Sequence, residues 1–232
     1  MVPRTRRNPA DLSYLSYRHR ILTALVMLNL PALRSATVAH DPFDYTIVDD
    51  FVSTEALASV SQDYPKIGST GSFPLSELQY GPAFDQLIAE LSGPGVRDAF
   101  SNRFDVDLAQ YVSIITVRGR VGSHDGGVHT DAKWKILSVL LYLNPTWESA
   151  GGRLRLLRGK DINQTAVEVV PKWGTLLAFK RADNSWHGHL PAEGERRVVQ
   201  LNWVTSQEKA DSELNRHRRS GFLKRLIGRK PY

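Results

Sequence analysis

The chain has 232 residues, which fits one medium-sized domain with terminal extensions and leaves little room for two domains. Its apolar fraction of 41% and charged fraction of 23% are ordinary for a globular protein with a sizeable core. The absence of cysteine excludes disulfides, thiolate metal sites and cysteine nucleophiles. Any metal must therefore be bound by His, Asp, Glu or backbone oxygen.

The net charge of +6 is concentrated at the two ends of the chain. Residues 1–20 sum to +4 and residues 208–232 sum to +5, which leaves −3 for the middle. A nucleic-acid enzyme more often carries a basic stripe on the body of its domain. Nucleic acid is therefore not an expected partner.

The N-terminal segment, residues 1–44, is expected to be a mainly helical extension. Its apolar run, residues 21–33, follows an arginine-rich stretch and resembles the apolar part of a signal peptide. The run is too short to span a bilayer as a helix. We expect an amphipathic helix in a cytoplasmic protein, with an export signal or membrane contact as the alternative.

Helical patterns dominate the next part of the chain. Residues 45–51 read as a short strand, and a helix is expected over residues 53–64. Two further helices are expected over residues 82–91 and 96–103, separated by Ser-Gly-Pro-Gly. The segment from residue 45 to residue 110 is thus interpreted as a helical support.

The second half of the chain changes to short β-rich runs separated by Gly, Pro, Asn and Asp. The expected strands cover residues 111–117, 135–143, 152–157, 166–170, 175–179 and 197–204. Two packed sheets would bury both sets of apolar faces and leave few edges. The sequence therefore predicts a mainly β fold with N-terminal helices (α+β), in which residues 111–206 form a cupin-like jelly roll, the double-stranded β-helix.

A possible metal site begins at His129-Thr130-Asp131. Residues i and i+2 of a strand point to the same side, so one imidazole and one carboxylate can reach a single ion. His187 could supply a third ligand, and two His with one carboxylate form the facial triad of non-haem Fe(II) sites. A surface turn is the alternative for the tripeptide, and His189 is an alternative to His187.

Further motifs follow this tripeptide in a fixed order. They are Leu141-Tyr142-Leu143-Asn144, Gly151-Gly152-Arg153-Leu154, Pro171 before a small-apolar strand, His187 and Arg197. In order and spacing, residues 129–203 resemble the catalytic core of the 2-oxoglutarate/Fe(II)-dependent oxygenases, in particular the prolyl-4-hydroxylase-like branch. The resemblance covers about a third of the chain and makes residues 45–206 the expected oxygenase domain.

This resemblance implies a dioxygenase with Fe(II) and 2-oxoglutarate as cofactors and ascorbate as a candidate reductant. His129, Asp131 and His187 would be the metal ligands. Such an enzyme uses dioxygen to hydroxylate its substrate while 2-oxoglutarate is decarboxylated to succinate and CO2. The substrate would be a small molecule, a sugar or a peptide. Asp131 argues against halogenation, because related halogenases have Gly or Ala at this position.

The resemblance also implies a basic residue that pairs with the distal carboxylate of 2-oxoglutarate, a task suited to the planar guanidinium of arginine. Family spacing places an inward Trp six residues after this basic residue. Trp203 lies six residues after Arg197, so Arg197 is the expected anchor and Arg196 is expected to face solvent. Tyr142 resembles the tyrosine that contacts the same carboxylate, with an ordinary core tyrosine as the alternative.

Two residues near the expected pocket entrance are weaker candidates. Arg118 ends the strand before the metal motif, where the family often places a polar contact to cofactor or substrate. His124 lies in a Gly/Asp-rich loop and could touch substrate. The loops over residues 119–128 and 180–185 are expected to shape the entrance.

Two other functions stay open at this stage. A non-catalytic binding module can use the same jelly roll, because a fold does not fix a function. A nucleic-acid demethylase of the same superfamily would agree with the basic ends but not with the acidic middle.

The C-terminal tail, residues 207–232, is basic. On a helix over residues 220–230, four apolar side chains would share one face and basic side chains would occupy the others. Such a helix can dock on its own domain or on a partner, or it can lie weakly on an anionic membrane surface.

Overall fold

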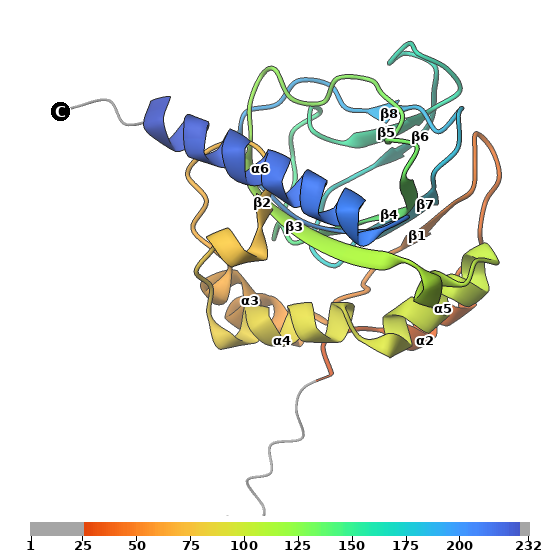
Figure 1. The fold of residues 1–232 in the computed structure, drawn as a ribbon, viewed down its shortest axis with the longest axis horizontal. Helices are drawn as coiled ribbons and strands as arrows, with labels where there is room; N and C mark the ends of the chain where they lie inside the picture. The colour runs from red at the N-terminus through yellow and green to blue at the C-terminus, as the bar shows by residue number, and fades with distance from the viewer. Residues whose placement is uncertain (1–25, 228–232) are drawn as a thin grey trace, which may run out of the picture.

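The computed structural model describes residues 26–227, and it describes side chains for residues 26–219 (Figure 1). The arginine-rich stretch on which the export-signal hypothesis depends and the side chains of the apolar face expected over residues 220–230 therefore lie outside the described part of the chain. None of the described helices combines the length and the apolar character that a membrane crossing needs.

Four helices precede most of the sheet. They are α2 (Leu30–Ser35), α3 (Leu57–Asp63), α4 (Pro82–Leu91) and α5 (Pro94–Phe104), with one-turn 3-10 helices at Thr54–Ala56, Leu75–Glu77 and Leu108–Gln110. Pro82 and Pro94 each begin a helix after a glycine. Proline suits a first helical position because its fixed φ is already helical and no N–H is needed there. For this reason α5 begins two residues earlier than expected.

The strands form two antiparallel sheets. The larger sheet has the order β1-β7-β4-β9-β3-β2, and the smaller has the order β6-β5-β8. Their bounds are β1 Tyr45–Val48, β2 Phe73–Pro74, β3 Val112–Val121, β4 Lys135–Tyr142, β5 Leu154–Leu157, β6 Thr165–Val169, β7 Leu176–Lys180, β8 His187–Gly188 and β9 Gly194–Val204. This arrangement is consistent with the expected jelly roll. The two-residue strands β2 and β8 were not anticipated, because two residues carry no periodicity.

The large sheet has an apolar core on each face. One core lies between the sheet and the helices and includes Leu201, Trp203 and Phe100. The other lies between the two sheets and includes Leu140, Leu177 and Val198. Figure 1 shows the helices α2 to α5 on one side of the sheet and the small sheet on the other. Both faces of the central strand β9 are therefore covered by other elements.

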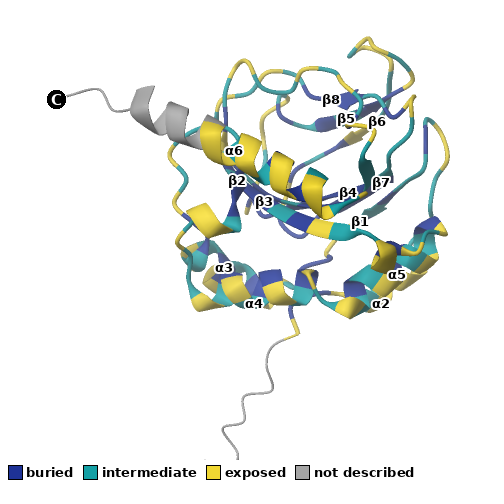
Figure 2. Ribbon diagram, viewed as in Figure 1, coloured by how far each residue is buried: buried dark blue, intermediate teal, exposed yellow. Residues whose placement is uncertain are grey.

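A last helix, α6 (Gln207–Ile227), follows β9 directly and runs across the molecule (Figure 1). Its first half contacts β2, β3 and β9. Ala210 is buried against Ile114 and Val204, and Arg218 reaches Ser76 with a hydrogen bond of 3.2 Å. Figure 2 shows exposed residues along the outer side of this half. The beginning of the basic tail is thus a helix docked on the domain.

Candidate metal centre

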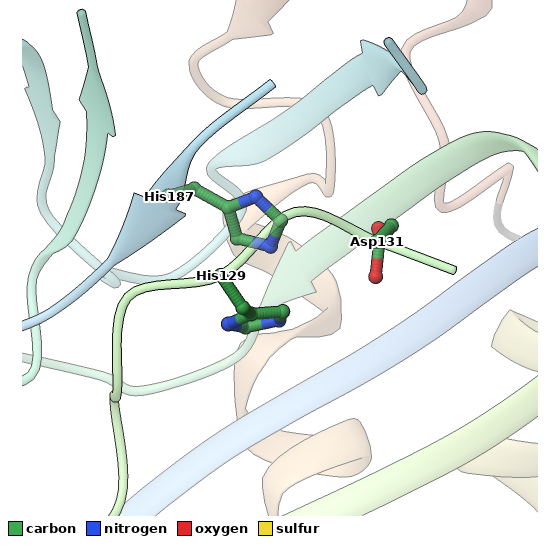
Figure 3. Close-up of side chains that lie close together, drawn as sticks. All are labelled: His129, Asp131 and His187. Atoms are coloured by element: carbon green, nitrogen blue, oxygen red, sulfur yellow. The ribbon is translucent and has the colours of Figure 1, made fainter. Parts of the chain in front are cut away.

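The three expected metal ligands come together between the two sheets. His129 and Asp131 lie in the segment before β4, and His187 is the first residue of β8. Backbone hydrogen bonds of 3.0 and 2.9 Å pair His129 with His187 in both directions. One ligand atom from each of the three residues lies within 4.8 Å of the others. Figure 3 shows the three side chains grouped around one space. The geometry therefore allows all three to hold one ion.

Each histidine ring is oriented by a backbone carbonyl. Nδ1 of His129 lies 2.8 Å from the oxygen of Gly127, and Nδ1 of His187 lies 2.9 Å from the oxygen of Ser185. A carbonyl oxygen can only accept, so Nδ1 carries the proton in both rings. Nε2 is then left with its lone pair, which is the arrangement that metal-bound histidines usually show.

Asp131 is 8% exposed, and both of its carboxylate oxygens are engaged. Lys135 Nζ lies 2.7 Å from Oδ1, and the hydroxyl of Ser138 lies 2.5 Å from Oδ2. Burial by itself would raise the pKa of Asp131, but the charges of Lys135 and His187 and these hydrogen bonds lower it to about 2. Asp131 is thus ionised at neutral pH, as a metal ligand must be.

His187 also has the protonation state that a ligand needs. Its side chain is buried, and this burial lowers its pKa to about 4, although the charge of Asp131 opposes the shift. The ring is therefore neutral at neutral pH. His189 is likewise buried, with a pKa lowered to about 4, chiefly by burial. Its Nδ1 bonds to the oxygen of Leu190, and it lies outside the cluster of three.

A pocket of about 710 Å³ opens beside the triad. Its lining includes Arg118 and Arg196 at one end, Gln200 and Asn202 along β9, and residues of α6 at the other end. Arg118 thus lines the pocket, as its position in the sequence suggested. His124 is exposed and does not line it.

The expected orientation of Arg196 and Arg197 is wrong. Arg196 is 3% exposed, lines the pocket and donates from Nε to the oxygen of Gly152 at 2.9 Å. Arg197 points the other way, where its guanidinium bonds to the oxygen of Ser61 and pairs with Glu195. The candidate anchor inside the pocket is therefore Arg196.

The physical reason is the face that Trp203 occupies. Trp203 does share a strand face with Arg197, because the two are six residues apart on β9. That face, however, packs on the helical layer. There Trp203 makes an edge-to-face contact with Phe100, with the two ring centroids 5.8 Å apart. The pocket face carries the residues of opposite parity, from Arg196 to Asn202.

Three buried polar atoms near this end of the pocket have no hydrogen-bond partner among the described residues. They are Arg118 Nε, Arg196 Nη2 and the hydroxyl of Tyr142. The β-sheet register brings Arg118 and Tyr142 to the two sides of Val198 on β9. Buried polar groups are nearly always paired, so this group of donors is suited to an anionic ligand. The role expected for Tyr142 stays a prediction.

Lys135 and Ser138 were not identified from the sequence, and neither were the pocket-lining residues of α6, Ser212, Glu213, Arg216 and His217. Lys135 and Ser138 lie four and seven residues after Asp131, at the start of a strand whose apolar pattern carries no sign of a polar site. The α6 residues lie far along the chain, so only the docking of the helix brings them to the pocket.

Comparison with known proteins agrees with this geometry. A family model described as the 2OG-Fe(II) oxygenase superfamily matches residues 109–205. No curated protein matches the chain. Among solved structures, a prolyl-4-hydroxylase from Pseudomonas putida has a TM-score of 0.51 at 17% identity and covers 76% of this chain and 97% of its own. This likeness supports the fold.

Two other solved structures are similar at lower scores. A prolyl 4-hydroxylase from Phytophthora capsici has a TM-score of 0.47 at 21% identity, covering 78% of this chain and 68% of its own. A viral collagen prolyl hydroxylase from Paramecium Bursaria Chlorella virus-1 has a TM-score of 0.48 at 16% identity, covering 72% and 92%. The resemblance inferred from the motifs is confirmed: residues 109–205 match the family model of the 2OG-Fe(II) oxygenase superfamily, and prolyl-4-hydroxylases are among the structures that share this fold.

Proposed function

We propose that this protein is an Fe(II)- and 2-oxoglutarate-dependent dioxygenase that hydroxylates a small-molecule, sugar or peptidyl substrate. One observation carries the proposal. A complete set of metal ligands lies beside a pocket, and the other end of this pocket holds buried hydrogen-bond donors that have no partner among the described residues. When bound, the metal and 2-oxoglutarate would supply dioxygen activation coupled to oxidative decarboxylation of the oxoacid to succinate and CO2.

The residues of the chain fit both groups. His129, Asp131 and His187 would hold the Fe(II), since two histidines and one carboxylate are the ligand set of such non-haem iron sites. Asp131 is ionised and His187 is neutral before any metal arrives, so neither has to lose a proton at neutral pH. Arg196 and Arg118 would pair with the distal carboxylate of 2-oxoglutarate, and the hydroxyl of Tyr142 would donate to it.

The protein also encloses part of the reacting centre, where Asp131 and His187 are buried and His129 is exposed. The small sheet covers one side of the triad, since His187 itself belongs to β8. The helix α6 contributes Glu213 and His217 to the pocket lining. Such walls would position a substrate bond next to the metal, which is a contribution that a protein makes to cofactor chemistry.

The test uses the full-length protein with Fe(II), 2-oxoglutarate and ascorbate. Binding of 2-oxoglutarate is first measured by calorimetry on the protein loaded with Mn(II) without oxygen. Oxygen consumption and succinate release are then followed with pools of candidate substrates. We expect metal-dependent binding of 2-oxoglutarate and substrate-stimulated succinate release. Binding of a pool compound without succinate release would indicate a non-catalytic module instead, and no binding of metal or 2-oxoglutarate would refute the proposal.

A further inference from the structure

The strand β9 carries a row of pocket-facing residues that continues beyond the candidate cofactor anchor. Arg196, Gln200 and Asn202 all line the pocket and share one strand parity. Gln200 lies between Thr116 of β3 and Leu140 of β4, and Asn202 lies between Ile114 and Ser138. The two amides therefore occupy the end of the pocket nearer to α6, away from Arg196.

Asn202 faces the pocket and makes no side-chain hydrogen bond to the described residues. Its side chain lines the pocket, the residue is 7% exposed, and no hydrogen bond to its amide occurs within residues 26–219. Its amide oxygen and nitrogen are accessible from the pocket, so both are available to what fills it. The molecule that fills this pocket is therefore expected to supply both a donor and an acceptor to Asn202.

Gln200 uses its amide oxygen within the protein and leaves its amide nitrogen available to a ligand. Its Oε1 accepts hydrogen bonds from Ser72 at 3.1 Å and from Thr116 at 3.2 Å. Its Nε2 donates to none of the described residues. Two hydroxyl donors thus fix the orientation of the amide and leave Nε2 as a donor toward the pocket.

Asn202 lies beside the metal ligands. It is directly opposite Ser138 in the antiparallel pair of β9 and β4, and side chains at such positions are about 5 Å apart. The hydroxyl of Ser138 in turn contacts Oδ2 of Asp131 at 2.5 Å. A molecule bound by Asn202 would therefore have its neighbouring carbon atoms next to the triad, where a hydroxylated C–H bond must lie.

The charged groups at this end of the pocket are paired with one another. Lys135 pairs with Asp131 at 2.7 Å. Glu213 accepts hydrogen bonds from Arg216 at 2.5 and 2.8 Å, and lies 3.1 Å from His217. Every charged group at this end of the described lining thus has an opposite charge beside it, and a ligand here meets neutral polar groups, with Gln200 and Asn202 on β9 among them.

We propose that Gln200 and Asn202 bind the substrate, and that the substrate presents a neutral group that both donates and accepts hydrogen bonds, a hydroxyl or a carboxamide, beside the bond that is oxidised. This inference rests on the proposed function, because it assigns the substrate end of the same pocket. An anionic substrate group would instead require an unpaired cation near Asn202, and the described lining offers none there.

The experiment compares neutral and charged probes on the full-length protein loaded with Mn(II) and 2-oxoglutarate without oxygen. The hydroxyl probe is D-glucose, with D-glucose 6-phosphate as its charged counterpart. The amide probe is N-acetylglycinamide, with N-acetylglycinate as its counterpart. Calorimetry should show that at least one neutral probe binds, and binds more tightly than its counterpart. The probe that binds identifies whether hydroxyl or carboxamide chemistry is recognised.

Two variants test the residues separately. Asn202→Leu keeps the approximate size and removes the hydrogen-bonding groups, and Gln200→Met does the same at the second position. Each should weaken binding of the neutral probe by about tenfold or more, the loss expected for one hydrogen bond of this kind. Asn163→Leu is the matched control, because Asn163 is exposed and does not line the pocket. It should bind the probe as the wild type does.

Loading with 2-oxoglutarate is measured in every variant and distinguishes the possible failures. A wild type that binds no 2-oxoglutarate overturns the proposed function and this inference with it. A loaded wild type that binds neither neutral probe, or prefers the charged counterparts, overturns this inference alone. This inference alone is also overturned if both loaded variants bind the neutral probe as tightly as the wild type does. If Asn202→Leu does not fold, Gln200→Met decides by itself.

Discussion

The guanidinium of Arg196 lies over the ring of Tyr142, with its central carbon 5.3 Å from the ring centroid. Both side chains are buried, and each keeps one polar atom without a partner among the described residues. The stacking fixes the plane of the guanidinium, while the bond from Nε to Gly152 fixes its position. Arg196 and Tyr142 thus form a preorganised pair of donors for one carboxylate.

Replacing Arg196 with Leu should weaken binding of 2-oxoglutarate to the Mn(II)-loaded protein by a hundredfold or more. Removal of one partner from a buried charge pair costs about 3–5 kcal/mol, and about 1.4 kcal/mol corresponds to a factor of ten. Calorimetry measures the change. Arg197→Leu is the matched control and should change the affinity little, because Arg197 faces Ser61 and Glu195. If Arg197→Leu weakened binding and Arg196→Leu did not, the register of β9 would be shifted by one residue.

Tyr142→Phe should weaken the same binding by about tenfold to a hundredfold. The change removes only the hydroxyl, and a hydrogen bond to a charged group contributes about 1.5–3 kcal/mol. The hydroxyl is buried and has no partner among the described residues, so its loss should not lower the free energy of unfolding of the unloaded protein and should raise it by about 1 kcal/mol or more. An unchanged affinity for 2-oxoglutarate would show that Tyr142 is an ordinary core residue.

Alanine at His129, Asp131 or His187 should each lower the affinity for Mn(II) by more than about a hundredfold. Loss of a residue that only orients a ligand already costs about 10–100-fold, so loss of a ligand costs more. His189→Ala should retain Mn(II) binding, because His189 lies outside the cluster of three. If His187→Ala retained Mn(II) binding and His189→Ala lost it, His189 would be the metal ligand in place of His187.

Lys135→Met should bind Mn(II) about tenfold more tightly than the wild type. The ammonium lies 2.7 Å from a carboxylate oxygen of Asp131, so an incoming dication is repelled by it. At an effective dielectric constant near 20 this repulsion is worth several kcal/mol, which partial movement of the side chain would reduce. Lys133→Met is the control, because Lys133 is exposed and does not line the pocket. Weaker metal binding in Lys135→Met would instead indicate that Lys135 holds Asp131 in place.

The stability of α6 should depend on pH through Glu213, whose partners Arg216 and His217 lie on the same helix. Burial would raise the pKa of this carboxyl, but hydrogen bonds from His217 and Arg216 lower it from 4.5 to about 2. The stabilisation is therefore complete above pH 4.5 and is lost as the pH falls toward 2, with an upper limit of about 3 kcal/mol. Urea unfolding at pH 5 and at pH 3 should show a larger loss for the wild type than for Glu213→Gln. Equal losses would contradict the assigned contacts.

Much of the local structure could be predicted from the sequence. Pro82–Leu91 forms the expected helix because a proline begins it and its apolar residues recur on one face. The metal motif was also readable, since His129 and Asp131 are two residues apart and His187 follows at the distance that the family shows. Order and spacing along the chain are properties of the sequence itself, so these features needed no tertiary information.

Which side of a strand faces the pocket was decided only by the tertiary structure. On β9 the face that packs on the helices carries Leu201 and Trp203, and the face toward the second sheet carries Val198 together with the pocket-lining residues. Strand periodicity places Arg196 and Arg197 on opposite faces, but it cannot tell which face packs on the helices. The packing of Trp203 on α5 decides it. The docking of α6 likewise brings Glu213 and His217 to a pocket whose metal ligands lie far away in the sequence.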